Sequence, residues 1–350
     1  MKLTKYKKIL MPDNRTRCGF TQIGWIILIA GIPLLFLIMA FSVTKGAAEI
    51  SLSTVGEAFF NFDNKNPQHL MVIDLRVPRV IASALVGSAL AVAGAMMQGM
   101  TRNPMADSGL MGLNAGAGFA LSISFAFFPE MNYLGIVLFS FIGAALGGGM
   151  VSAIASLGKG GLNPMRMVLA GAAVSALLVS LSQGIAIYFN LAQDIMFWTV
   201  GGVAGSNWQQ IKMMAPLILT ALLGAVILSR FISVLSLGED VARGLGMNIA
   251  LVTAICAVIV LLLAGAAVAV VGAVGFVGLM IPHLARYLVG VDYRWIIPSS
   301  AVLGALLMVL ADLGSRMINP PTETPIGALI ALLGVPFFLY LARKQGRTGV

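Results

Sequence analysis

The sequence is poor in charge. Only 10% of its 350 residues are Asp, Glu, Lys or Arg, whereas 59% are hydrophobic, and the mean hydropathy is +0.96. A soluble domain uses about a quarter of its residues as charged groups. The composition therefore excludes a soluble globular protein and indicates one that is embedded in a lipid bilayer.

Cysteine and histidine are also scarce, with two residues of each. Cys18 and Cys256 lie far apart in the sequence, and no His/Cys cluster includes His69 or His283. Disulfide frameworks and metal or haem sites need such residues at characteristic spacings. We therefore expect no disulfide, no metal site and no cofactor in this chain.

Acidic residues are missing from the middle of the apolar stretches. Asp312 is the one acid that we place inside a membrane span, near its outer end. Ion-coupled transporters usually keep ionisable groups at mid-membrane, and a membrane-embedded hydrolase needs a nucleophile with a base or a metal. The shortage argues against both classes and indicates that the energy for any transport comes from elsewhere.

Long apolar runs are what the sequence has in abundance. A helix needs about 20 apolar residues to cross a bilayer. The charge-free stretches are Phe20–Val43, Val80–Met100, Gly109–Phe128, Met131–Leu157, Met167–Gln193, Met213–Ser229, Gly244–Pro282, Trp295–Ala311 and Pro325–Ala342. Gly244–Pro282 is too long for one span, so we expect two spans with a tight turn near Val271–Gly275. The prediction is an all-α polytopic membrane protein with ten transmembrane helices.

The lysines and arginines are distributed unevenly over the loops. With the loops numbered alternately from the N-terminus, one set carries 16 of the 22 lysines and arginines, and the other set carries 6. The positive-inside rule places the first set, and with it both termini, in the cytoplasm. The net charge of +9 is thus mostly a topology signal, because charges scattered over membrane-flanking loops are weak evidence for nucleic-acid binding.

The expected layout is a single membrane domain with short ends. Residues 1–19 form a cytoplasmic N-terminal segment, residues 20–342 the ten-helix domain, and residues 343–350 a cytoplasmic tail. No signal-peptidase-like site follows the first apolar block, so we expect that block to be retained as a span. The longest polar segment, residues 45–79, lies outside and includes a short surface helix over Ser51–Phe60.

Two spans show a faint similarity. Leu85–Gln98 resembles Leu263–Phe276, five spans further on. An odd offset indicates a weak inverted internal repeat, a common plan for transporters; alternatively, helices rich in Gly, Ala and Val resemble one another by composition alone. The spacing Gly143-x-x-x-Gly147 favours close helix packing.

Three arginines are expected on the outer side. Arg76 and Arg79 lie at the outer end of the second span, and Arg316 precedes the last span. Together they suggest a surface that docks an acidic partner. Each also has a structural interpretation, because long side chains at a membrane interface extend toward water and Arg316 can pair with Asp312 one helical turn away.

The longest inner loop, residues 230–247, contains a second polar group. Glu239, Asp240 and Arg243 allow a short helix, and neighbouring glycines allow turns on both sides of it. Such a helix is a natural contact for a cytoplasmic partner. The alternative is an ordinary solvated connector.

A third polar group, Thr101–Asp107, follows the second span. Its Asn-Pro pair breaks the helix, and the glycine-rich Gly109–Gly118 comes next. That stretch lacks the Gly-Lys-Ser/Thr ending of a phosphate-binding loop, and no strand precedes it. We therefore expect no nucleotide site in this chain.

Several long stretches together resemble a known family, the FecCD or type II transmembrane subunits of ABC importers for iron-siderophores, haem and vitamin B12. The resemblance runs from about residue 45 to the end of the sequence. The matching stretches, in the family's order, are 75–118 (LRVPRVIASALVGSALAVAGAMMQGMTRNPMADSGLMGLNAGAG), 197–208 (FWTVGGVAGSNW), 237–247 (LGEDVARGLGM), 272–290 (GAVGFVGLMIPHLARYLVG), 311–316 (ADLGSR) and 322–344 (TETPIGALIALLGVPFFLYLARK).

The resemblance implies a set of partners in a bacterial cytoplasmic membrane. Two permease subunits, as a homo- or heterodimer, flank one pathway. Two cytoplasmic ATPase subunits bind ATP-Mg and drive transport, so this chain is not itself an enzyme, and an external substrate-binding protein delivers the cargo. A ferric siderophore is the commonest cargo, with vitamin B12 or haem as alternatives. An ion-coupled secondary transporter is the alternative from another class.

The resemblance also implies roles for particular residues. Arg76, Arg79 and Arg316 match arginines that pair with glutamates of the binding protein. The residues that match the coupling helix in the ATPase groove are Glu239, Ala242, Arg243, Leu245 and Gly246. The residues that match the cytoplasmic gate are Asn103, Met105, Pro164 and Met165. The loop around Pro164 lacks the small polar residues expected of a vitamin B12 permease, which favours another cargo.

Overall fold

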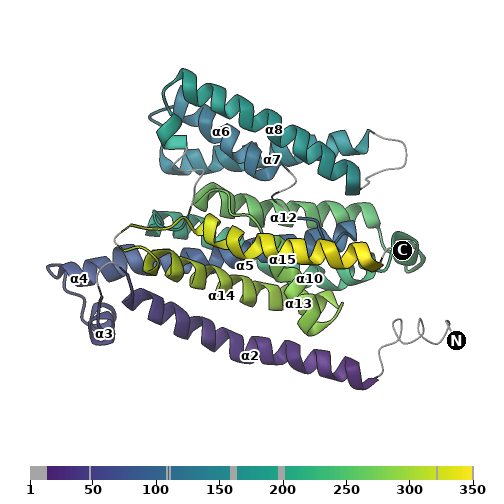
Figure 1. Ribbon diagram of the computed structural model, residues 1–350, viewed down its shortest axis with the longest axis horizontal. Helices are drawn as coiled ribbons and strands as arrows, with labels where there is room; N and C mark the ends of the chain where they lie inside the picture. The colour runs from purple at the N-terminus through teal and green to yellow at the C-terminus, as the bar shows by residue number, and fades with distance from the viewer. Residues whose placement is uncertain are drawn as a thin grey trace.

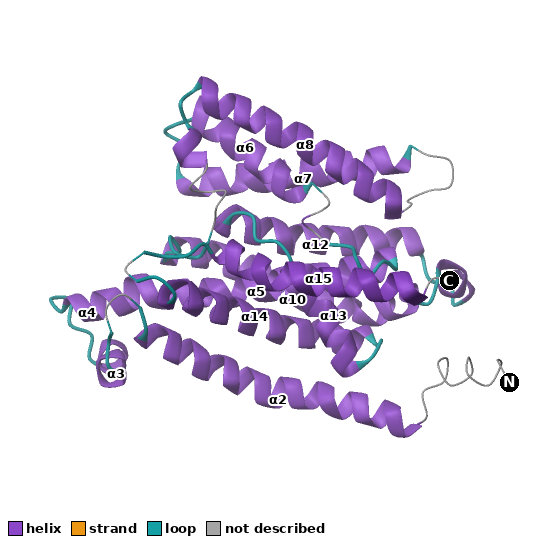
Figure 2. Ribbon diagram, in the orientation of Figure 1, coloured by secondary structure: helices purple, strands orange, loops and turns teal. Residues whose placement is uncertain are grey.

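The computed structural model describes residues 14–46, 49–107, 109, 112–157, 164–195, 202–320 and 322–348. All regular secondary structure in these ranges is helical (Figure 2). The helices are α2 (Asn14–Thr44), α3 (Leu52–Phe60), α4 (Pro67–Leu70), α5 (Val77–Thr101), α6 (Leu113–Phe127), α7 (Tyr133–Ser156), α8 (Pro164–Tyr188), α10 (Trp208–Ser236), α11 (Glu239–Gly244), α12 (Ile249–Val271), α13 (Val277–Val289), α14 (Tyr293–Met317) and α15 (Ile326–Thr348). The π-helical segment Met71–Arg76 joins α4 to α5. The predicted all-α class is confirmed.

Seven helices in the described part of the chain are long and apolar enough to cross a membrane. Three further apolar helices, Leu113–Phe127, Val277–Val289 and Ile326–Leu339, are shorter. A helix lies at each of the ten expected positions, but the count of ten spans stays a prediction because three helices fall short. Residues 272–276, which lead into α13, are not helical. Extended chain advances about 3.3 Å per residue, against about 1.5 Å in a helix, so a short helix with such a segment before it covers more distance than its own length indicates.

The bundle has two ends that differ in structure (Figure 1). We call them the α3 end and the α11 end. The indole Nε1 of Trp208, at the start of α10, donates to the carbonyl of Ile73 at 2.9 Å, which places both at the α3 end. Arg102 follows α5 and pairs with Glu239 of α11, so α5 begins at the α3 end and finishes at the α11 end.

The helices extend beyond the apolar stretches at the α3 end. The second span was expected over Val80–Met100, but the chain is helical from Pro67 onward. The last part of the polar segment predicted over residues 45–79 is therefore helical, and its bounds stay a prediction. Charged side chains ended the apolar run without ending the helix, because Arg76 and Arg79 find partners inside the protein. The predicted short helix is confirmed as α3, with Ser51 as its N-cap.

The same difference occurs at the α11 end. Helix α10 continues to Ser236, past the expected apolar end at Ser229, so the first part of the cytoplasmic loop predicted over residues 230–247 is helical, and the bounds of that loop stay a prediction. Helix α15 continues to Thr348, through most of the predicted tail 343–350, and α2 begins at Asn14, inside the predicted segment 1–19. Charged side chains are compatible with a helix that leaves the bilayer, so hydropathy marks the membrane part and not the helix end.

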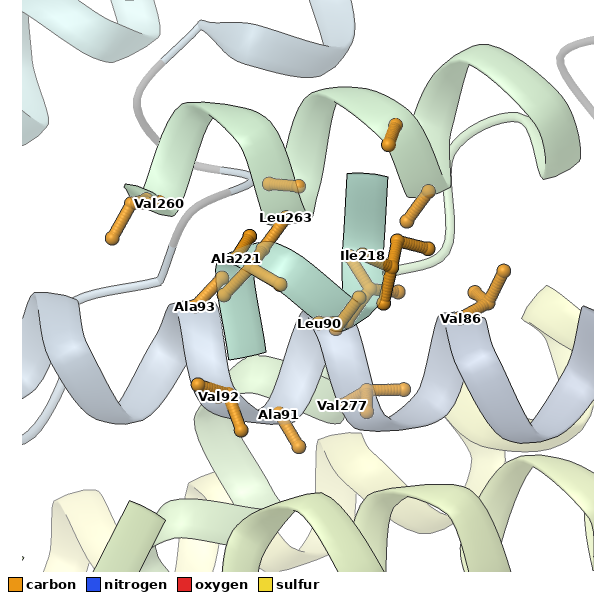
Figure 3. Close-up of a cluster of buried hydrophobic side chains, with 14 of the residues drawn as sticks. Val86, Leu90, Ala91, Val92, Ala93, Ile218, Ala221, Val260, Leu263 and Val277 are labelled. Carbon is orange, nitrogen blue, oxygen red and sulfur yellow. The ribbon is translucent and has the colours of Figure 1, made fainter. Parts of the chain in front are cut away.

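Helix α5 forms the centre of the core. Of its 25 residues, 19 are buried. A helix that is apolar on all sides belongs inside a bundle, and α5 packs against α10, α12, α13 and α14. In Figure 3, Leu90 and Ala93 point toward Leu263 of α12, while Val92 points away from the opposite face of α5.

Helices α6, α7 and α8 pack on one another as a group beside α12, and α2 lies on the opposite side of the bundle (Figure 1). The predicted glycine spacing lies inside this group: a Cβ on Gly143 or Gly147 would overlap the carbonyl oxygens of Gly116 or Gly112. The predicted close approach is thereby confirmed.

Glycines also bring α5 into backbone contact with two neighbours. A Cβ on Gly94 would overlap the carbonyl oxygen of Gly278 in α13, and a Cβ on Gly87 would overlap that of Gly304 in α14. Small residues at helix contacts are the main device for packing helices in lipid, where burial from water contributes little.

The two similar segments differ in structure. Residues 85–98 are helical throughout, whereas α12 ends at Val271 and residues 272–276 are not helical. The break between two helices predicted near Val271–Gly275 is present, with Gly272 at φ 77°. Residues 272–275 form non-helical chain and not the tight turn that was expected. Helices α5 and α12 do run in opposite directions, because α12 begins beside α11. The inverted repeat itself stays a prediction.

We predict that Gly94→Ala destabilises the bundle by about 1–3 kcal/mol, as overpacking does elsewhere, because the added methyl group meets a backbone carbonyl that has no room to move. Thermal unfolding of the purified chain in detergent measures the loss. Gly184→Ala is the matched control, since a Cβ there meets nothing within 4 Å. Equal melting temperatures for the two variants would contradict the prediction.

Candidate functional site

An ion cluster lies at the α3 end. Asp312 of α14 is fully buried and has an arginine on each carboxylate oxygen. Arg79 of α5 donates from Nε to Oδ1 at 2.7 Å, and Arg316 donates from Nη2 to Oδ2 at 2.9 Å. The pair Arg316–Asp312, offered from the sequence as the structural alternative, is therefore present. One carboxylate joins α5 to α14.

Two guanidinium groups of this end hold the last turn of α2. Arg316 donates from Nη1 to the carbonyls of Ser42 at 3.1 Å and Lys45 at 2.7 Å, and Arg76 donates from Nη1 to the carbonyl of Val43 at 2.8 Å. The last carbonyls of a helix lack partners within the helix and carry partial negative charge. Arginines from two other parts of the chain satisfy them.

The exposure expected of these arginines is wrong. Arg76, Arg79 and Arg316 are only 7%, 8% and 6% exposed, whereas the sequence suggested that they present their charge to the outside. The reason is that each has partners inside the protein, which a count of charges along the chain does not show. Their role in docking is not tested by this geometry and stays a prediction.

Glu323 is the exposed member of the cluster. Its Oε1 lies 2.7 Å from Nη1 of Arg79, and its side chain is 42% exposed. The amide of Thr324 donates to the carbonyl of Ser315 at 3.0 Å, which fixes this segment beside α14. Glu323 was not among the expected site residues; its signal in the sequence is an isolated acid just before the last apolar stretch.

We call Arg76, Arg79, Arg316, Asp312 and Glu323 the arginine cluster. Its three positive and two negative groups leave a formal charge of +1. A separate, exposed pair lies nearby, with Lys45 Nζ 2.6 Å from Glu49 Oε1. Hydrogen bonding to Lys45 lowers the pKa of Glu49 below its ordinary value. The positive charge of the arginine cluster is therefore buried, and the accessible member of the cluster is the acid Glu323.

At the α11 end, the predicted short helix between glycine turns is confirmed. Gly238 and Gly246 have φ of 124° and 77°, values that favour glycine. Ala242 is fully buried and anchors α11 to the bundle. Val241 of α11 is exposed, and so are Leu237 before the helix and Leu245 after it. Exposed apolar side chains on a polar connector indicate a contact surface.

Glu239 joins α11 to the end of α5. It lies 3.3 Å from Arg102 and 3.3 Å from Arg243, and all three side chains are substantially exposed. Exposed pairs of this kind stabilise a protein by about 0–1 kcal/mol. The contact therefore aligns α11 with α5 and contributes little stability.

The residues predicted at the gate are only partly described. The side chain of Asn103 accepts from the amide of Met105 at 2.9 Å, which closes a tight turn after α5. Helix α8 begins at Pro164, and the side chains of Pro164 and Met165 lie outside the described part. The structure therefore brings Asn103 and Met105 together, and the gate stays a prediction.

A buried polar contact near the α11 end escaped the sequence analysis. Arg286 of α13 donates from Nη2 to Gln98 Oε1 at 3.3 Å and to the hydroxyl of Tyr293 at 3.0 Å. Gln98 lies in α5 and Tyr293 begins α14, so this contact joins three helices. The available signal was Gln98, a lone polar side chain in a long apolar run.

Within the described residues, His, Cys, Asp and Glu nowhere gather in a group of three or more that could hold a metal ion. The arginine cluster has two acids in contact with guanidinium groups. The arrangement can therefore bind carboxylates or hold helices together, and it offers no nucleophile or base in position for a reaction.

The sequence matches the model of the FecCD transport family over residues 34–344. It is 51% identical to the iron(3+)-hydroxamate import system permease protein FhuB of Bacillus subtilis, over 97% of this chain and 90% of that protein. It is 38% identical to the ferric enterobactin transport system permease protein FepD of Escherichia coli, over 95% of this chain and 99% of that protein.

A solved structure described as an inward-facing conformation of a metal-chelate type ABC transporter shares the fold, with a TM-score of 0.78 and 27% identity over 91% of this chain and 99% of that chain. PsaBC from Streptococcus pneumoniae aligns with a TM-score of 0.56 and 19% identity, over 75% of this chain and 90% of that chain, and shows the fold alone. With its apolar helices, the chain is a multi-pass membrane protein.

We predict that Asp312→Asn lowers the free energy of unfolding by about 3–5 kcal/mol, the usual cost of breaking a buried ion pair, because two buried arginines lose their shared carboxylate. Glu323→Gln is the matched control and costs about 1 kcal/mol or less, since its side chain is accessible to water. Thermal unfolding in detergent compares the two. Similar losses would show that Asp312 does not hold the cluster together.

Proposed function

The chain belongs to the FecCD transport family, and we propose that it is the membrane-spanning subunit of an ABC importer for a ferric siderophore. The observation that carries the proposal is the family match over residues 34–344, which includes both polar ends of the bundle. The relatives described above are permeases for iron chelates. That favours a ferric siderophore over vitamin B12 or haem as the cargo.

In this proposal the α3 end faces outward and the α11 end, with both termini, faces the cytoplasm of a bacterium. The distribution of lysines and arginines supports this orientation, because the loops assigned to the cytoplasm carry 16 of the 22. A second permease subunit completes the pathway, and two ATPase subunits bind ATP-Mg and hydrolyse ATP. In this proposal the chain binds its partner subunits and changes conformation to move the cargo, and it catalyses no reaction itself.

The arginine cluster is the proposed docking point for an external substrate-binding protein. Arg79 is buried, and its partner Glu323 is 42% exposed. In this proposal an incoming carboxylate takes the place of Glu323 on Arg79. Docking then exchanges an internal carboxylate for one of the partner, while Asp312 holds Arg79 in place. Charged pairs at the rim of an interface mainly orient partners and speed their encounter.

Helix α11 is the proposed contact for the ATPase. Its exposed Val241, with Leu237 before the helix and Leu245 after it, offers apolar surface to a groove of the ATPase, and buried Ala242 anchors α11 to the bundle. Movement of α11 reaches α5 through Glu239 and Arg102. The contact among Gln98, Arg286 and Tyr293 lets α5, α13 and α14 move together as a rigid unit, which is the usual form of such transitions.

We predict that Glu323→Gln raises the affinity of the importer for the binding protein by up to about fivefold. The change removes the carboxylate that competes with the binding protein for Arg79, and an exposed ion pair of this kind contributes up to about 1 kcal/mol. Arg79→Gln should weaken docking by tenfold or more. The measurement uses the importer reconstituted in nanodiscs with its binding protein. Glu57→Gln, an exposed acid on α3, is the matched control.

Unchanged affinity in both Glu323→Gln and Arg79→Gln would remove the docking role from the arginine cluster. ATP dependence tests the wider proposal in the same preparation. Uptake of a ferric siderophore that continues without ATP would favour an ion-coupled secondary transporter and overturn the ABC importer.

We predict that Arg243→Glu abolishes the stimulation of ATP hydrolysis while membrane insertion and folding stay normal, because the change places three acids together on an exposed six-residue helix. ATPase activity with and without the loaded binding protein gives the readout. Arg230→Glu, at an exposed position of α10 at the same end, is the control and should keep the stimulation. Full stimulation of the Arg243→Glu importer would show that α11 does not couple ATP hydrolysis to transport.

A further inference from the structure

A large cavity opens between α7 and α12 near the α11 end. Its volume is about 1160 Å³, which exceeds the roughly 300–1,000 Å³ of typical small-molecule pockets. Small side chains from both helices make room for it, among them Gly148 and Gly149 on α7 and Ala250, Ala254 and Ala257 on α12. Helices α7 and α12 lie next to each other in Figure 1.

The cavity is apolar inside and borders on surface that faces lipid. Met97, Leu113 and Leu235 line its inner part, and Val258 of α12 lines it while more than half exposed. Leu146 of α7, in the helix that forms the opposite wall, is exposed as well. In a bilayer such apolar side chains contact acyl chains, so a hydrocarbon chain that entered between α7 and α12 would meet apolar side chains throughout.

Charged side chains lie at one place in the lining. Arg102 follows α5, and Glu239 and Arg243 belong to α11. The two arginines exceed the one acid by a formal charge of +1. Their contacts with Glu239 are both 3.3 Å and exposed, so a phosphate can replace the carboxylate at small cost.

An apolar interior with a basic mouth fits one class of molecule, an amphiphile with a negative head. Basic pockets between transmembrane helices on the cytoplasmic side are known to hold acidic lipid headgroups. We propose that this cavity binds an anionic phospholipid, with its acyl chains between α7 and α12 and its phosphate between Arg102 and Arg243. The site is separate from the arginine cluster at the α3 end, but it shares Arg102, Glu239 and Arg243 with the proposed ATPase contact, so a bound phosphate would also act on the link between α11 and α5.

Native mass spectrometry and thermal unfolding of the purified full chain in detergent test the proposal, with phosphatidylglycerol, phosphatidylcholine or inorganic phosphate added. We expect phosphatidylglycerol to bind and to raise the melting temperature most. Each arginine-to-glutamine change, Arg102→Gln or Arg243→Gln, should weaken its binding by about fivefold. Arg230→Gln, at the same end but outside the lining, is the charge control.

A second variant narrows the cavity without disturbing the fold. A Cβ on Gly149 meets nothing within 4 Å, so Gly149→Leu projects into the space and should weaken the binding of phosphatidylglycerol. Gly184→Leu, equally open but outside the lining, should leave it unchanged. Phosphatidylglycerol binding that is unchanged in Gly149→Leu, or equal stabilisation by inorganic phosphate or phosphatidylcholine, would overturn the proposal.

Discussion

The close backbone contact of α5 with α13 and α14 is the constraint on which the rest of the structure depends. Helices in lipid gain little from leaving water, so they associate through packing and hydrogen bonds. Gly87 and Gly94 let α5 touch the backbones of α14 and α13 directly. Because α5 is fixed along its length, its two ends are fixed as well: Arg79 meets Asp312 at one end, and Gln98 meets Arg286 near the other.

This arrangement gives one helix a share in both polar ends of the molecule. The arginine cluster joins the start of α5 to α14, and Arg102 joins its finish to α11. In the proposed importer, an event at one end therefore acts on the same rigid element as an event at the other. The side chains between the ends are apolar and closely packed (Figure 3), so movement passes through the position of the helix.

Much of the fold could be predicted from the sequence because its signals are local. Apolar runs gave the helix positions, the glycines around residues 238 and 246 predicted the turns that flank α11, and the long stretch divided near Val271 as expected. The burial of Arg79 could not be predicted in this way, since its partner Asp312 lies 233 positions away. Glu323, the contact of Arg286 with Gln98, and the cavity beside α7 likewise depend on segments that only the folded chain brings together.

The arginines that hold the last turn of α2 have a consequence for biosynthesis. Ser42 precedes Arg316 by 274 residues, and ribosomes add about 5–20 residues per second, so the interval between their synthesis is roughly 15–55 s. Arg76, 33 residues after Val43, is made much sooner and can hold one carbonyl of that turn early. The carbonyls of Ser42 and Lys45 must rely on water or on lipid headgroups until Arg316 is made. The end of α2 is therefore secured in two steps, and the second step comes late in synthesis.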